Sequence, residues 1–171
     1  FKSNVVISNV NAKTTVFGLV GENNFDKEYV DYIKAIKMSP AMSLVFLGVE
    51  MDLSMYPNFI KDLDEGFDIF INSNADKSSA PKGKACITII EHPKYNYNDF
   101  PERNTDEYYK VKHEYMETLI NKAQKHIPDL SKHIVYKDSS TPKTLEHYTL
   151  VPEGAMYIFD TSTEKYPKTI I

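Results

Sequence analysis

Apolar residues gather along the chain in short runs that are rich in β-branched and aromatic side chains. Runs of this length, bounded by polar residues, Gly or Pro, predict buried strands. The predicted strands cover residues 5–7, 42–49, 68–72, 85–90 and 133–138, with a last strand or turn at 154–159. Between them, residues 52–66 lack a clear period, 73–84 are polar, and 91–103 are rich in Pro, Asn and Tyr. We expect loops or irregular structure in these three segments.

Helical spacing of apolar residues first occurs near the start of the chain. The residues that carry this pattern are Phe25, Tyr29, Tyr32, Ile33 and Ile36. They predict an amphipathic helix from 26 to 38, which ends before Pro40. Shorter helices are predicted from about Asn11 to Gly21, where Asn9 or Asn11 caps the start, and from 141 to 149.

The strongest local pattern predicts a long helix from 105 to 126. Its apolar face consists of Tyr108, Val111, Tyr115, Leu119, Ala123 and Ile127. Asn104 and Glu107 have the spacing of a capping box, and Pro128 ends the helix. Acidic residues lie near its start and basic residues near its end, which favours the helix dipole.

The order of these elements predicts an α+β domain with a mostly antiparallel, mixed sheet covered by helices, because only some strands alternate with helices. The 171 residues suit a single domain spanning 1–171. A chain of this size buries roughly 70% of its unfolded surface, so it needs no metal or disulfide to stabilise the fold.

Composition excludes several classes of protein. The net charge is −4, and the basic residues are lysines apart from Arg103, which argues against a nucleic-acid-binding protein. No apolar run reaches the ~18 residues of a membrane span, and no signal peptide opens the chain. Cys86 is the only cysteine, so no intramolecular disulfide forms, as is typical of a reducing, cytoplasmic environment.

Motifs for catalysis or metal binding find no support in their surroundings. Gly18 and Gly21 close a predicted helix and do not open one, as a phosphate-binding loop would require. The two Ser-x-x-Lys motifs, at 79–82 and 140–143, need their serine in the first turn of a helix; Pro81 and Gly83 disrupt a helix at the first site, and Pro142 weakens the motif at the second. The five histidines include no pair four residues apart, so we expect no metal site and leave the catalytic residues unassigned.

Three aromatic residues lie in the irregular stretch before the long helix. Tyr95, Tyr97 and Phe100 serve there either as anchors of the loop or as part of an apolar wall that contacts a ligand. The sequence pattern leaves both interpretations open. Taken alone, composition and spacing indicate an α+β domain without a self-contained active site.

The order of six segments carries more information than any one of them. The segments are 5–14, 43–49, 80–84, 127–135, 141–148 and 154–157. In this order they resemble the middle of phytoene desaturase-type flavoproteins, a family that includes carotenoid desaturases, carotenoid isomerases and retinol saturases. The resemblance extends over roughly residues 4–160. Val10-Asn11 departs from the Ala-Asp that is usual in the family.

The resemblance implies that this chain is the substrate-binding insert of a larger FAD-dependent oxidoreductase. Both flavin-binding ends of the family pattern are missing, and the chain opens inside an apolar run, which predicts that it was cut from a longer polypeptide. The whole protein would bind FAD and oxidise or reduce an apolar isoprenoid or polyene by hydride transfer. We expect the chain alone to bind no FAD and to be inactive.

The resemblance also assigns positions and partners. Ser8, Asn9, Gly154 and Tyr157 would lie near the flavin of the whole protein, and Tyr95, Tyr97 and Phe100 near the substrate. The partners would be an apolar small molecule, the missing cofactor domain and the periphery of a membrane, and exposed apolar surface predicts a homodimer. Two other classes stay open: a free-standing α+β module that binds a ligand or protein without catalysis, and a hydrolase with an unrecognised site.

Overall fold

The computed structural model describes residues 2–157 and 159–160 and contains a five-stranded antiparallel sheet. The strands are β1 (Ser43–Val49), β2 (Phe59–Asp62), β3 (Phe67–Ile71), β4 (Ala85–Glu91) and β5 (Ile134–Ser140). Their order across the sheet is β2-β3-β4-β1-β5, and every neighbouring pair is antiparallel. Helices accompany the sheet, which confirms the predicted α+β fold class.

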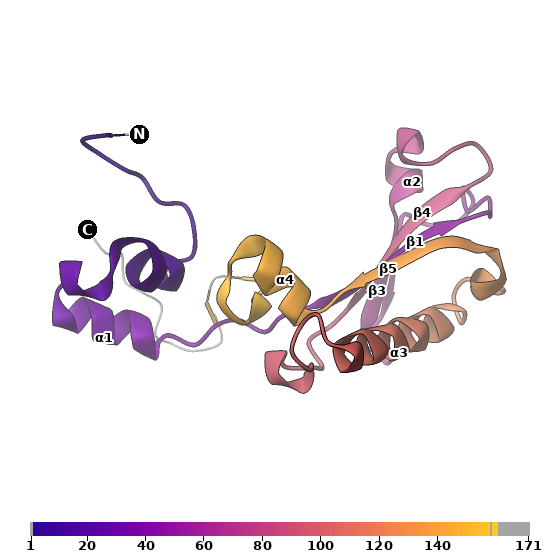
Figure 1. The fold of residues 1–171 in the computed structure, drawn as a ribbon. Coiled ribbons are helices and arrows are strands. Elements are labelled where there is room, and N and C mark those ends of the chain that lie inside the picture. The colour runs from indigo at the N-terminus through magenta and orange to yellow at the C-terminus, as the bar shows by residue number, and fades with distance from the viewer. Residues whose placement is uncertain (1, 158, 161–171) are drawn as a thin grey trace.

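The long helix α3 (Asp106–Ala123) lies along one face of the sheet (Figure 1). Strands β1, β3 and β4 alternate buried and less buried residues, because successive side chains point to opposite faces. The inward residues of these strands meet the apolar face of α3 in the main core. This core includes Val45, Leu47, Ile69, Ile87, Ile89, Tyr115, Met116, Leu119, Ile120 and Ile127. The predicted helical face is confirmed, although Val111 is only half-buried.

A second, smaller cluster forms in the first part of the chain. Helix α1 (Lys27–Ala35) packs against a π-helical turn, η1 (Thr14–Val20), through Val16, Val30 and Ile33. Figure 1 shows this helical part at the opposite end of the molecule from the sheet, with α4 (Pro142–Thr149) between them.

Two stretches of chain that are far apart in sequence run side by side between α1 and the sheet. Ala41 and Ala155 form an antiparallel bridge, and the Met156 N–H donates to the Pro40 carbonyl at 3.2 Å. The stretch that leads into β1 is thereby paired with the stretch that follows α4. This pairing takes the place of the strand or turn predicted at 154–159, of which residue 158 lies outside the described residues.

The prediction of a buried strand at 5–7 is wrong. Val5, Val6 and Ile7 are exposed, and the described residues provide no strand beside them. Strand hydrogen bonds need a neighbour, so an apolar β-branched run without one stays extended in solvent. The short helix α2 (Asn72–Ala75) and the 3₁₀ turn Lys77–Ser79 occupy the segment that was predicted to be a loop.

Two further predictions are corrected by local geometry. β2 lies within residues 52–66, which showed no period, because this edge strand is stabilised by its pairing with β3 and has little apolar pattern of its own. The cap of α3 is Thr105, whose hydroxyl accepts from the Tyr108 N–H, while Asn104 has a positive φ of 68° and lies before the cap.

Candidate functional site

The face of the sheet opposite α3 is an apolar surface that α3 leaves uncovered. We call it the open face, and it consists of Leu44, Phe46, Gly48, Phe59, Lys61, Asp68, Phe70, Cys86, Thr88 and Ile90. Phe46, Phe59 and Phe70 are each exposed over more than a third of their surface. Large apolar patches on a protein surface usually mark a binding site.

The strand register arranges these residues in rows that cross the sheet. One row contains Phe46, Thr88, Phe70 and Phe59, one from each of four successive strands. The rings of Phe59 and Phe70 pack with centroids 4.7 Å apart, while the smaller Thr88 lies between Phe46 and Phe70. Since neighbouring strands are about 4.8 Å apart, the apolar row extends for roughly 14 Å.

Polar elements border the open face at two places. At one corner the Cys86 thiol lies 3.1 Å from the carbonyl oxygen of Ser79, so the chain after α2 closes that corner. Cys86 is half-buried on this face and not in the main core. At another corner Asp68 faces His92, with 3.1 Å between a carboxylate oxygen and the ring Nε2.

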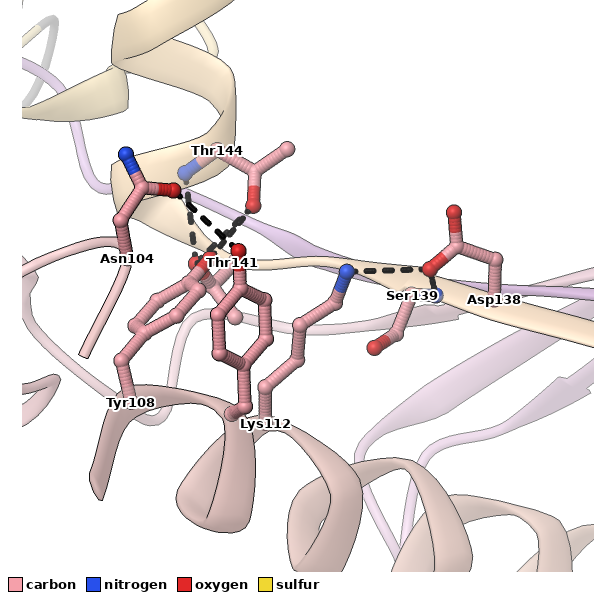
Figure 2. A network of polar contacts seen from close by, with 8 residues as sticks. Asn104, Tyr108, Lys112, Asp138, Ser139, Thr141 and Thr144 are labelled. Atoms are coloured by element: carbon pink, nitrogen blue, oxygen red, sulfur yellow. Dashed lines mark hydrogen bonds and ion pairs between the residues drawn. The ribbon is translucent and has the colours of Figure 1, made fainter. Parts of the chain in front are cut away.

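A hydrogen-bonded junction fixes α4 where β5 ends (Figure 2). The Tyr108 hydroxyl lies 2.9 Å from the Thr141 hydroxyl and 2.7 Å from the Thr144 hydroxyl. Lys112 donates to Asp138 at 3.0 Å. Burial alone would raise the pKa of Asp138, but the hydrogen bonds from Lys112 and from a backbone N–H hold it below its usual range. The junction therefore holds the start of α4 against the first turn of α3.

A buried acid lies between the sheet and α3. Glu91 is 4% exposed, and burial raises the pKa of its carboxyl group. Burial also raises the pKa of the Tyr115 hydroxyl, and the nearby Glu91 charge adds to this effect. Both groups lie on the α3 side of the sheet and therefore do not belong to the open face.

The three aromatic residues predicted to contact substrate separate into two places. Tyr95 and Phe100 pack with Tyr115 at ring-centroid distances of 5.7 to 6.2 Å and line a hollow of about 480 Å³ beside α3. Tyr97 instead lies beneath the Lys143 amine, 4.5 Å from its ring centroid. A hydrogen bond to Glu146 raises the pKa of Tyr97 to about 12. The structure therefore places all three away from the open face.

The four residues predicted to lie near a flavin lie in two places, Ser8 and Asn9 before η1, and Gly154 and Tyr157 in the stretch that follows α4. The exposed Ser8 shares a hydrogen bond of 2.7 Å with Thr15, and Asn9 is also exposed. Gly154 is buried against α4, and the Tyr157 N–H donates to the Ser39 hydroxyl at 2.8 Å. Among the described residues, no hydrogen bond joins Ser8 or Asn9 to either of the other two.

The glycines near the start of the chain do not have the arrangement of a phosphate-binding loop. Gly18 lies inside η1, and Gly21 follows η1 and precedes a 3₁₀ turn of only three residues, Glu22–Asn24. Within the described part of the chain, no cluster of His, Cys, Asp or Glu has the arrangement of a metal site. The helices described are also too short or too polar to cross a membrane.

Sequence reasoning missed the open face because a dense apolar run such as 42–49 does not show which face of a sheet each of its residues occupies. Phe46 and Phe70 were visible as strand residues, but only the register shows that they share a face. His92 has no histidine or carboxylate at metal-ligand spacing that would single it out, and its partner Asp68 is distant in sequence. The comparisons add no family assignment, since no family model and no curated protein matches this chain.

Proposed function

We propose that this chain is the substrate-binding region of an FAD-dependent oxidoreductase similar to phytoene desaturases, and that its open face forms a wall against an apolar isoprenoid or polyene. The observation that carries this proposal is the uncovered row of phenylalanines on a sheet whose other face is sealed by α3. A wall of this kind binds an apolar chain by removing both surfaces from water.

The path of the chain supports the same proposal. The stretch before β1 and the stretch after α4 are paired, so the sheet, α2 and α3 are reached and left through one narrow connection. An insert that contributes a wall to a larger enzyme needs this kind of entry and exit. The order of segments that resembles the flavoprotein family includes β1 itself and residues 154–157 after α4.

The proposal gives this chain the tasks of orienting the substrate and excluding water. The flavin would be held by the cofactor domain of the larger enzyme, as the resemblance implies. We therefore assign no step of hydride transfer to any residue here.

The proposal is tested by ligand binding to the intact chain. Geranylgeraniol should displace an apolar dye from the wild type, and Phe46→Lys should weaken this binding about tenfold, since it removes a large part of one buried aromatic contact. Met55→Lys is the matched control, because Met55 is 94% exposed and lies outside the open face. Mixing with FAD should leave the fluorescence of free FAD unchanged.

Two results would count against the proposal. If the chain binds no apolar ligand, the open face is not a wall that contacts a substrate. Equal weakening by Phe46→Lys and Met55→Lys would mean that binding occurs elsewhere, which favours a free-standing binding module.

A further inference from the structure

The Asp68 and His92 pair is a polar site on the open face, which is otherwise mainly apolar. The register of β3 places Asp68 on this face, beside Ile90 of β4 and Lys61 of β2. His92 follows β4 directly, and its N–H donates to the Gly66 carbonyl at 2.8 Å, which fixes its backbone. Its Nε2 lies 3.1 Å from Asp68 Oδ2.

Both side chains keep unused hydrogen-bonding capacity. The Oδ1 atom of Asp68 is buried and has no hydrogen-bond partner among the described residues. The other ring nitrogen of His92, Nδ1, likewise makes no hydrogen bond within the described part of the chain. The side chains are 17% and 32% exposed, so a ligand that covers the open face would also cover this corner.

Covering this corner with a hydrocarbon is unfavourable. The pair would lose its remaining contact with water and gain no hydrogen bond in return, and a buried polar group without a partner weakens binding. A hydroxyl group avoids this cost because it both donates and accepts. It can donate its proton to Nδ1 while the N–H at Nε2 donates to Asp68, and an ether cannot make this contact.

We propose that Asp68 and His92 recognise a hydroxyl group on the apolar ligand, so that the ligand of the open face is an isoprenoid alcohol and not a plain hydrocarbon. This inference rests on the proposed function, since it assumes that the open face binds an apolar chain. His92 contacts the hydroxyl, and Asp68 is a positioning residue that orients the ring.

The chain contains a matched control for this site. Asp62 and His126 form a similar pair with 2.8 Å between the carboxylate and Nε2, but they lie at the end of α3. The His126 ring packs against Phe67 on the α3 side of the sheet, with centroids 6.0 Å apart. Removing the imidazole from either site changes the chain in the same way, but only one site borders the open face.

The experiment compares geranylgeraniol with its methyl ether by displacement of an apolar dye from the full chain. The two ligands share one chain, and the ether lacks the hydroxyl proton. The wild type should prefer the alcohol by about threefold to tenfold, the range expected for one hydrogen bond. His92→Phe should abolish this preference, and His126→Phe should keep it. His92→Gln, which keeps an amide able to hydrogen bond, should retain part of the preference.

The outcomes separate this inference from the proposed function. Equal binding of alcohol and ether by the wild type overturns the inference alone, as does a preference that survives in a folded His92→Phe variant. If neither ligand binds the wild type, the proposed function fails and the inference fails with it. A preference that is lost in His92→Phe and kept in His126→Phe supports the assignment.

Discussion

Removing one hydroxyl group from the junction of α3, β5 and α4 should measurably destabilise the protein. Tyr108 is 1% exposed, and its hydroxyl lies within hydrogen-bond distance of Thr141 and Thr144 (Figure 2). Tyr108→Phe keeps the ring in the core and deletes only the oxygen. The buried Thr141 hydroxyl and the half-buried Thr144 hydroxyl then lose a partner.

The size of the effect follows from these contacts. One intramolecular hydrogen bond contributes about 0.5–1.5 kcal/mol net, and a buried group left without a partner costs more. The hydroxyl oxygens of Thr141 and Thr144 lie 3.3 Å apart and can still hydrogen bond to each other, which recovers part of the lost free energy. We therefore expect Tyr108→Phe to lower the free energy of unfolding by about 1–2 kcal/mol.

Urea unfolding of two variants tests this reasoning, because the neighbouring tyrosine is a matched control. Tyr109 is 53% exposed, and its hydroxyl donates to Asn104 at 3.2 Å, so water can replace that bond. Tyr109→Phe should cost less than about 0.5 kcal/mol. Tyr108→Phe and Thr144→Val should couple by about 0.5–1.5 kcal/mol in a double-mutant cycle. Equal midpoints for the two tyrosine variants, or additive effects in the cycle, would refute the junction as described.

Three further substitutions test the core, the backbone and the buried acid. Leu119→Ala should lower the free energy of unfolding by about 2–5 kcal/mol, because it truncates a buried side chain of α3. Lys110→Ala, on the exposed side of α3, should change it by less than about 0.5 kcal/mol. Similar losses for the two variants in urea unfolding would contradict the packing of α3. Gly154→Ala should lower the melting temperature more than Gly66→Ala, because both have a positive φ but only at Gly154 would a Cβ lie 2.1 Å from a backbone oxygen of α4. Glu91→Gln should stabilise the protein at pH 7 and not at pH 4, because burial raises the pKa of the Glu91 carboxyl group and its ionisation above that pKa destabilises the folded state. An equal gain at both pH values in urea unfolding would exclude this cause.

Elements whose own residues carry a complete pattern could be predicted from the sequence. α3 was found because its buried residues recur at helical spacing over many turns, and no partner is needed to see that spacing. β1 and β4 were found because dense β-branched runs favour strands wherever they pair. The α+β class then followed from the order of the elements along the chain.

Features that depend on a partner could not be predicted in this way. β2 pairs with β3 across a short turn, and only the register with Phe70 shows on which face of the sheet Phe59 lies. Residues 5–7 carry a strand pattern but have no neighbour in the described residues. The pairing of Asp68 with His92 also depends on the register of the sheet, because the two residues belong to different strands or their ends.

The residues of the strands nevertheless suit an open face that is covered by a partner. An antiparallel sheet with one face in water usually alternates apolar with polar residues. Here Leu44, Phe46 and Ile90 occupy outward positions, so β1 and β4 are largely apolar on both faces. Strands of this kind are typical of sheets buried on both sides, yet α3 covers only one. This mismatch supports the proposed apolar partner for the second face, and the polar corner at Asp68 supports the proposal that this partner brings a hydrogen-bonding group with it.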